Sequence, residues 1–411
     1  MGKYLAPGVY VEEVPSGARP IQAVGTSTAG FVGIAPLPSA HPQEAVGISN
    51  WTQFLREFAS NGGDHVGNHL AQAVYGFFLN GGSRCYVVNC QSEDQLTGSH
   101  QGVNVLETVD EVAIVAAPGM TGASAYDAVL SHCELMENRV AILDGAPEAP
   151  SMQALIQVAT EGGRRRQAGS PEAEAEPAAN PKQVQGLRPR NSDQGYGAVY
   201  FPWIVCADPF RPGHPPLFTP PSGHLAGIYA RCDARRGVHK APANESIRGA
   251  LDVRYRLTRQ EQAELNPQGV NCIRFFPGEG IRVWGARTLA PAAGEWRYIN
   301  VRRLFNMVKE SIALSTRWVV FEPNDEYLWK AIVRDVSAFL TLLWRQGALQ
   351  GGTPEEAFFV QCDAVTNPQE VIDAGRVVTR IGLAPVKPAE FVIFQIGQGS
   401  GGVEREAPAG G

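Results

Sequence analysis

The residues with the clearest potential for catalysis are a serine and a histidine close together in sequence, Ser222 and His224. A hydrolase of this type needs a nucleophile, a histidine base and an acid that converge in one pocket. Side chains this near in sequence point apart in most backbones, and no Gly-x-Ser-x-Gly turn surrounds Ser222. A second serine, Ser27, lies in the turn Gly25–Gly30, but no histidine precedes it, as the Asp–His–Ser chain order of one protease class requires. Neither serine predicts a catalytic site.

The sequence also contains no convincing metal-binding or cofactor-binding motif. His65 and His69 have the spacing of one helix face, but no third ligand accompanies them and Gly67 lies between. The Gly-Glu-Gly run at 278–280 lacks the further glycine of a dinucleotide-binding turn, and no phosphate-loop lysine pattern is present. We therefore expect no metal and no cofactor, and a protein that is not an enzyme.

The cysteines indicate a reducing compartment. Their number is odd, none forms a Cys-x-x-Cys pair, and most stand in apolar runs, which favours buried reduced thiols. The N-terminus lacks the apolar segment of a secretory signal, and no run approaches the ~18 apolar residues of a membrane span. We expect assembly in the cytoplasm and no direct membrane insertion. The cysteines are Cys85, Cys90, Cys133, Cys206, Cys232, Cys272 and Cys362.

Composition limits the class of protein. The 411 residues include 44% hydrophobic and 18% charged side chains, enough for a packed interior and, at about 150 residues per domain, two or three domains. The 35 basic and 41 acidic residues leave a net charge of −6, which argues against a protein that coats nucleic acid. The 45 glycines and 30 prolines exclude a fold dominated by long helices.

The first half of the chain alternates apolar strands with helices. Continuous β-branched runs separated by helices predict an α/β domain with a parallel sheet covered on both faces. The expected strands lie at residues 28–34, 85–89, 112–116, 140–143 and 199–205, and the expected helices at 51–58, 69–79, 124–137 and 151–160. Residues 161–195, rich in Arg, Glu and Pro with almost no large apolar side chains, predict a mobile surface insertion.

The last third predicts an α+β domain. Apolar spacing indicates a helix over residues 300–315, a buried strand at Trp318–Phe321, and a long helix capped by Asn324 and ending at Gly347. Asn367 and Pro368 open a further helix. Strands are expected at 377–383 and 391–396. At the other end, Gly8–Val14 reads as a strand isolated between prolines, with no hairpin partner nearby.

Seven segments, in order along the chain, resemble contractile tail sheath proteins. The matches cover residues 1–20 and 199–397 densely, and the short chain most resembles the sheaths of extracellular contractile injection systems. The segments are 6–12 (APGVYVE), 231–244 (RCDARRGVHKAPAN), 271–289 (NCIRFFPGEGIRVWGARTL), 296–305 (WRYINVRRLF), 318–325 (WVVFEPND), 353–358 (TPEEAF) and 388–394 (PAEFVIF).

The resemblance implies a fold and a division of the chain. The family's middle domain is subtilisin-like in fold, and since this chain lacks an ordered triad, the resemblance implies a scaffold without proteolysis. The insertion is not part of the family pattern. The implied parts are an N-terminal arm (1–22), an α/β segment (23–105), the subtilisin-like α/β domain (106–289) with its insertion (161–195), an α+β C-terminal sheath domain (290–397) and a flexible tail (398–411).

The resemblance also assigns a role to the two terminal strands. In sheaths such strands reach neighbouring subunits and pair there, a form of strand addition in which backbone hydrogen bonds give affinity. The alternative is that both strands pair within their own chain. The residues implied in this exchange are Val9, Tyr10, Val11, Glu12, Val14, Phe391, Val392, Ile393, Phe394 and Ile396.

The implied function is mechanical. Subunits stack as six-fold helical rings around an inner tube protein, with baseplate and terminal cap proteins as further partners, and no nucleic acid. A baseplate signal then releases a metastable extended state, and contraction drives the tube through a target membrane. On the polar side of the long helix, Lys330, Arg334 and Asp335 are candidates for facing the tube, against the alternative of a merely solvated face. The competing functions are a baseplate or cap component and an α/β hydrolase with Ser222 and His224 in one pocket.

Overall fold

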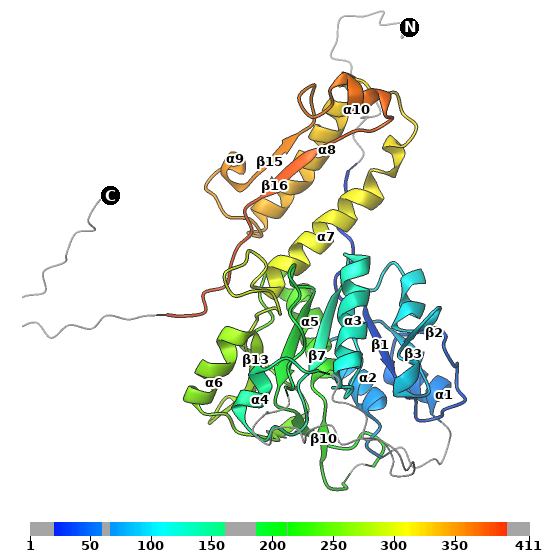
Figure 1. The fold of residues 1–411 in the computed structure, drawn as a ribbon, viewed down its shortest axis with the longest axis vertical. Coiled ribbons are helices and arrows are strands. Elements are labelled where there is room, and N and C mark those ends of the chain that lie inside the picture. The colour runs from blue at the N-terminus through cyan, green and yellow to red at the C-terminus, as the bar shows by residue number, and fades with distance from the viewer. Residues whose placement is uncertain (1–19, 60–65, 161–185, 212, 393–411) are drawn as a thin grey trace, which may run out of the picture.

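The computed structural model describes residues 20–59, 66–160, 186–211 and 213–392. They form an elongated molecule in which a large α/β body carries a smaller C-terminal domain, and helix α7 (Ile299–Ser315) runs between the two (Figure 1). The expected strand at 9–14 and residues 393–396 of the expected C-terminal strand lie outside the described residues. None of the helices in the described part combines the length and the apolar character that crossing a membrane requires.

The body is built on a nine-stranded mixed sheet. Its six central strands, from β13 to β3, are parallel, whereas β2, β14 and β11 pair antiparallel at the edges. The expectation of a parallel sheet therefore holds for the centre alone. The order across the sheet is β11 (Glu245–Ser246), β14 (Gly280–Trp284), β13 (Val270–Phe276), β8 (Gly197–Phe201), β7 (Val140–Asp144), β6 (Ile114–Ala116), β1 (Ala29–Gly33), β3 (Cys85–Asn89) and β2 (Ala45–Ile48).

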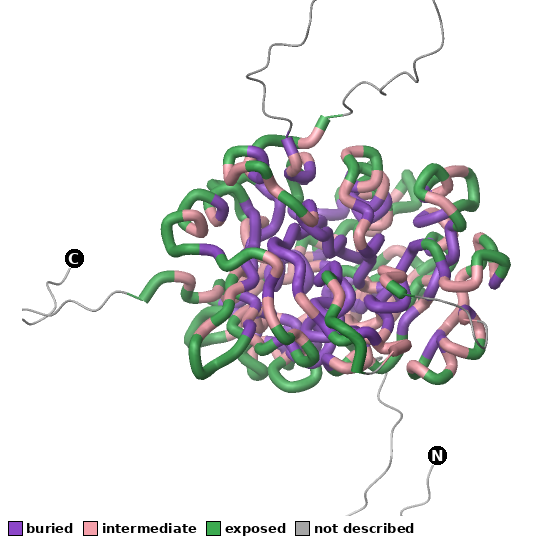
Figure 2. Tube along the Cα trace, turned by 90° about the horizontal axis from the view of Figure 1, so that it is seen from below, coloured by how far each residue is buried: buried purple, intermediate pink, exposed green. Residues whose placement is uncertain are grey.

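Helices cover both faces of this sheet, as the continuous apolar strands predict. Successive side chains of a strand enter opposite cores: Phe31 belongs to the core that α1, α2 and α5 cover, and Val32 to the core that α3, α4 and α6 cover. Figure 2 shows the buried residues in the interior, beneath exposed loops. The helices are α1 (Trp51–Phe58), α2 (His69–Asn80), α3 (Ala123–Met136), α4 (Met152–Ile156), α5 (Ser222–Arg236) and α6 (Arg259–Leu265).

Local signals set the ends of these helices. The Asn50 side chain accepts a hydrogen bond from the Gln53 amide at the start of α1. Gly81 ends α2 in the left-handed region with φ 115°, which glycine adopts without strain. Thr258 and Glu261 form a reciprocal capping box at α6.

The expected strand at 199–205 is wrong as a single element. The chain divides at Pro202, which has no amide proton for a sheet ladder, into β8 and β9 (Ile204–Cys206). Strand β9 lies between β10 (Leu217–Thr219) and β12 (Ala250–Val253) in a separate three-stranded sheet. A short hairpin of β4 (Thr97–Gly98) and β5 (Gln101–Gly102) completes the body.

The C-terminal domain consists of two helices packed on a two-stranded sheet. Helix α8 (Glu326–Arg345) buries the expected apolar stripe against α7 and against β15 (Phe358–Gln361), which pairs antiparallel with β16 (Arg380–Leu383). Its cap is Asp325 rather than Asn324, whose side chain instead accepts from the Trp329 indole. The short helices α9 (Pro354–Ala357) and α10 (Gln369–Asp373) close the domain.

The expected buried strand at Trp318–Phe321 is wrong. Residues Arg317–Val319 form a 3-10 turn after α7, and the chain then turns outward. Val320 is 62% exposed and Phe321 is fully exposed. An apolar run predicts burial, but it does not say whether the burial occurs within the same chain.

Part of the predicted insertion is packed on the body. Residues 161–185 lie outside the described residues, but Arg188 is buried and its guanidinium donates to the Gln268 carbonyl oxygen at 2.7 Å. Arg190 bonds Asp127 and Glu134 on α3. Residues 186–195 therefore contribute to the structure of the body.

Candidate functional site

The serine and histidine of the sequence do not meet. Ser222 begins α5, where its hydroxyl and amide both donate to the buried Asp144 carboxylate, at 2.8 and 2.7 Å. Burial raises the pKa of Asp144 to about 6, although these donors and the Gly119 amide favour the ionised form. The His224 ring faces Cys206 instead, with Nε2 3.6 Å from Sγ. No carboxylate stands behind this imidazole within the described residues, so a charge-relay site is not formed.

The remaining reactive groups are also structural. His69 is half-buried, and its ring packs edge-on against Trp203 with centroids 5.1 Å apart. Its expected metal partner, His65, is outside the described residues, and no group of metal-ligating side chains occurs in the described ranges. All seven cysteines are buried and free. Burial raises the pKa of the Cys133 and Cys206 thiols to about 12, so neither is a nucleophile near neutral pH.

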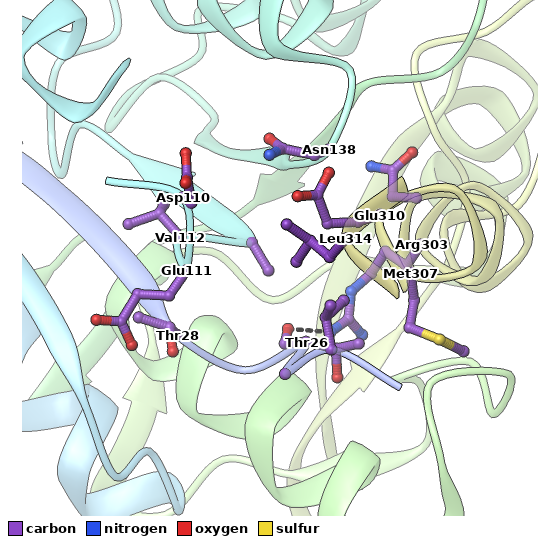
Figure 3. A pocket seen from close by; sticks show the side chains of 14 residues that line it. Thr26, Thr28, Asp110, Glu111, Val112, Asn138, Arg303, Met307, Glu310 and Leu314 are labelled. Carbon is purple, nitrogen blue, oxygen red and sulfur yellow. Dashed lines mark hydrogen bonds between the residues drawn. The ribbon is translucent and has the colours of Figure 1, made fainter. Parts of the chain in front are cut away.

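The joint between the body and the C-terminal domain is locked by a buried ion pair. Arg303 on α7 donates to both carboxylate oxygens of Asp233 on α5, at 2.5 and 3.0 Å. Thr26, in the segment that enters β1, donates its hydroxyl to Asp233. Its carbonyl accepts from Arg303 at 3.0 Å (Figure 3). The Arg303 guanidinium also lies 4.7 Å from the centre of the Tyr229 ring. Three distant parts of the chain are thus tied at one point, which explains the suggestive turn at 25–30 without catalysis.

A cavity of about 320 Å³ lies beside this ion pair. The sticks in Figure 3 come from the segment before β1, the loop before β6, the loop between α3 and β7, and the side of α7. Its lining includes three carboxylates, those of Asp110, Glu111 and Glu310, over apolar groups such as Met307. They do not form a metal-binding group within the described residues, and the cavity marks the seam between α7 and the sheet.

A second buried cation anchors the start of α7. Arg302 is 2% exposed and has no carboxylate bonded to it among the described residues; its Nε donates to Asn306 at 2.9 Å. The guanidinium lies between the rings of Trp296 and Tyr196, at 4.0 and 4.6 Å from their centres. Stacked aromatic faces stabilise a cation that has left water. Both arginines of the Arg302–Arg303 pair therefore hold α7 to the body.

The C-terminal segment leaves the body at a clasp centred on Glu390. Arg287 donates to both oxygens of this carboxylate, at 2.9 and 2.7 Å. Asn266 and the Tyr298 hydroxyl add bonds of 2.9 and 3.1 Å. Burial disfavours the ionised form, but these donors hold the pKa of Glu390 below its usual value. Beyond the clasp, Phe391 is exposed and lines a pocket with Trp284 and Tyr298.

The two-stranded sheet of the C-terminal domain has open edges. Phe358, Val360, Ile381 and Leu383 pack toward α8, whereas Phe359 is 57% exposed and its ring covers Gly382. Neither strand pairs with a second strand within the described chain, although the Ala384 carbonyl directly after β16 accepts from the Gln350 amide at 2.7 Å. An isolated strand pair is marginally stable, and its unpaired amides and carbonyls accept a further strand readily.

The three candidates for facing a tube separate in the structure. Lys330 is exposed and pairs with Glu326 one turn earlier, and Arg334 is half-exposed. Asp335 is buried, with its side chain 4% exposed and bonded by Arg334. It stands three residues after Ile332 and therefore lies on the apolar stripe, not on the polar side expected for it.

Sequence reasoning missed the residues that hold the joint and the clasp. Arg303, Asp233, Arg287 and Glu390 all lie inside the segments that carry the family resemblance. The available signal was charge within otherwise apolar runs, which predicts a buried pair but not which residues are partners.

Two family models match the chain and together cover most of it. The phage tail sheath protein central domain matches residues 101–289, and the phage tail sheath C-terminal domain matches residues 293–398. The fold as a whole aligns with the PVC sheath complex of an extracellular contractile injection system in its contracted state. That alignment covers 97% of this chain and 99% of the other, with a TM-score of 0.74 and 31% identity. The chain belongs to the phage tail sheath family, whose proteins are structural and not enzymatic.

The chain is also similar to a chain of the anti-feeding prophage and to phage tail sheath proteins. A chain in the 6-fold symmetrised baseplate structure of the anti-feeding prophage aligns over 96% of this chain and 99% of its own, with a TM-score of 0.72 and 31% identity. The tail sheath protein of Vibrio phage KVP40 is 30% identical over 178 residues, which are 43% of this chain and 26% of the phage protein. The chain spans about a quarter to two-fifths of the length of the curated relatives it matches.

Proposed function

We propose that this chain polymerises as stacked helical rings around an inner tube, and that contraction of the polymer drives the tube through a target membrane. The observation that carries the proposal is the alignment with a contracted sheath along nearly the whole length of both chains. In the resulting model, subunits assemble in a metastable extended state, and the energy comes from new contacts between subunits rather than from a nucleotide. The other partners are baseplate and cap proteins, in a particle assembled in the cytoplasm and released from it.

The joints between subunits would be strands donated by the two chain ends. Residues 9–14 and 391–396 are the donors, and the open edges of β15 and β16 are the acceptors we favour. Each strand of this pair has one unpaired side within the described chain. The edges of the large sheet suit the role less well. The Gln53 side-chain amide already donates to the Gly47 carbonyl of β2, and β11 is only two residues long. Each backbone bond gained would contribute roughly 0.5–1.5 kcal/mol.

Two surfaces of the C-terminal domain are candidates for contact with partners. The charged side of α8, with Lys330 and Arg334, is the candidate for the tube. The outward turn at Val320 and Phe321 exposes apolar side chains that a single chain leaves in water. The division into an arm (1–22), a body and a C-terminal sheath domain (290–397) follows from the same model, with the body's strands from 23–105 and 106–289 joined in one sheet.

Electron microscopy of the chain expressed alone tests the proposal. We expect hollow, ribbed tubes at high concentration, and none from a chain that lacks residues 1–15, whose body should keep its melting temperature. Monomers at every salt and protein concentration would contradict a sheath and favour the alternative of a baseplate or cap component. Unchanged tubes after the deletion would contradict the role of the N-terminal strand.

A further inference from the structure

The segment that follows the N-terminal arm is fastened along helix α7. The Gln22 and Val24 amides donate to the hydroxyls of Ser315 and Ser311, at 3.3 and 3.0 Å. Two residues after Val24, the Thr26 carbonyl accepts from Arg303. The segment therefore runs antiparallel to α7, and the arm begins at the C-terminal end of this helix.

The segment that precedes the C-terminal strand is fastened at the opposite end of the same helix. Tyr298, the residue before the first turn of α7, donates its hydroxyl to Glu390. Asn300, in the first turn, donates to the Val386 carbonyl at 3.2 Å. Both chain ends thus leave from α7, one from each terminus of the helix.

A helix is a suitable spacer because its length is fixed by its backbone hydrogen bonds. The 17 residues of α7 correspond to about 25 Å. The buried Arg303–Asp233 pair and the stacked Arg302 hold α7 to the body, so the helix does not move independently of it. The two departure points are held apart by the same distance in every subunit.

The last described residues of this segment, beyond Val386, are held by the side chain of Glu390. Within the described residues, the segment from 387 to 392 belongs to no strand, and Glu390 receives four hydrogen bonds from three residues of the body and its joint with α7. The neighbouring Phe391 and Val392 are 72% and 69% exposed. A planar guanidinium that meets a carboxylate with two parallel bonds fixes direction as well as position.

We propose that α7 is the strut that sets the separation of the two linking strands, and that Glu390 is the pin that fixes the C-terminal strand to it. Glu390 acts as a positioning residue: its hydrogen bonds go to residues of its own chain, and it determines where the donated strand starts and in which direction it leaves. This proposal rests on the strand exchange proposed above, since a fixed separation matters only if both strands bind neighbours.

The separation is measurable in the single chain. All seven native cysteines are buried, so spin labels react at introduced cysteines in Pro20→Cys/Val392→Cys. We expect a narrow distance distribution, on the order of 25 Å before the label arms are added. Glu390→Gln, which keeps the shape but loses the charge, should broaden it at least twofold. Arg287→Lys should have an intermediate effect, because lysine keeps the charge without the two-pronged geometry.

Assembly is measured with the unlabelled chains. We expect Glu390→Gln to raise the protein concentration needed for tubes at least tenfold while the body keeps its circular dichroism spectrum and melts within a few degrees of the wild type. The matched control is Glu279→Gln, which removes a carboxylate from an exposed pair with Arg282 on the same body and should change neither readout.

A deletion of residues 393–411 separates this proposal from the one on which it rests. One outcome is that the deletion abolishes tubes while Glu390→Gln and Arg287→Lys leave both the distances and the assembly unchanged. The positioning role of Glu390 is then refuted, and the exchange of the C-terminal strand is supported. If the deleted chain forms normal tubes, exchange of the C-terminal strand is refuted, whatever the distances show. Broadened distances with normal assembly would refute the positioning role.

Discussion

The ion pair between Arg303 and Asp233 gives a sharp test of how α7 is held to the body. Arg303 is 3% exposed and Asp233 7%, so the Asp233→Ala variant leaves a buried guanidinium without its carboxylate. The change removes two bonds from Arg303 and one from the Thr26 hydroxyl. Stranding one charge of a buried pair costs about 3–5 kcal/mol, since the desolvation penalty of the other charge remains.

The size of the coupling distinguishes a specific pair from general packing. Asp233→Leu combined with Arg303→Met removes both charges and fills the space with apolar groups. The loss in free energy of unfolding of this double variant should be smaller than the summed losses of the two single variants, by about 2 kcal/mol or more. The matched control is Glu137→Ala at the end of α3, which breaks the exposed pair with Lys309 of α7 and should cost about 1 kcal/mol or less.

Hydrogen exchange of the α7 amides is the suitable assay, because the body and the C-terminal domain need not unfold together. We expect Asp233→Ala to speed exchange in α7 by roughly a hundredfold or more. If the free-energy costs of the two single variants simply add up to that of the double variant, the view that this pair locks the joint is refuted. The same holds if Asp233→Ala speeds exchange in α7 no more than Glu137→Ala does.

Three further predictions concern stability and surface contacts. Burial lowers the pKa of His224 from 6.5 to about 4. As pH falls, the unfolded chain therefore takes up a proton on this ring before the folded chain does, and the free energy of unfolding falls by about 3 kcal/mol between pH 6.5 and pH 4. In urea titrations, His224→Gln should make the free energy of unfolding depend less on pH in this range. Gly223→Ala should lower the melting temperature strongly, because its Cβ would lie 2.3 Å from the Ala73 backbone, whereas Gly25→Ala, with nothing within 4 Å, should be nearly neutral; equal effects would contradict the tight α2–α5 contact. Phe321→Ser should leave the melting temperature of the monomer within about 1 °C yet weaken tube formation, and unchanged sedimentation of tubes would show that this exposed ring has no partner in the sheath.

The sequence predicts this fold best where periodicity and end signals agree. Helix α1 begins at its expected residue because Asn50 caps it, and α8 buries the whole expected stripe from Leu328 to Leu343. The apolar runs of β3 and β7 also lie where expected, since continuous β-branched strands suit a sheet covered on both sides.

The sequence-based predictions are wrong or missing where the environment of a residue depends on residues that are far away in the sequence. Asp335 is polar but lies on the apolar side of its helix, and only the position three residues after Ile332 would have indicated it. Phe321 belongs to an apolar run, yet the single chain leaves it exposed. Glu390 was passed over because its partners Arg287 and Asn266 are more than a hundred residues away, and spacing along one sequence does not identify such pairs.

The burial of every cysteine has a consequence for the durability of the particle. In the released particle proposed above, surface thiols of adjacent subunits would meet an oxidising medium and become cross-linked. A thiol with a pKa of about 12, such as that of Cys133, is ionised in only about one molecule in ten thousand at pH 8, and burial keeps oxidants away from it. No covalent bond then forms between neighbours during storage. Each contact between subunits therefore stays reversible, and the extended sheath remains able to contract.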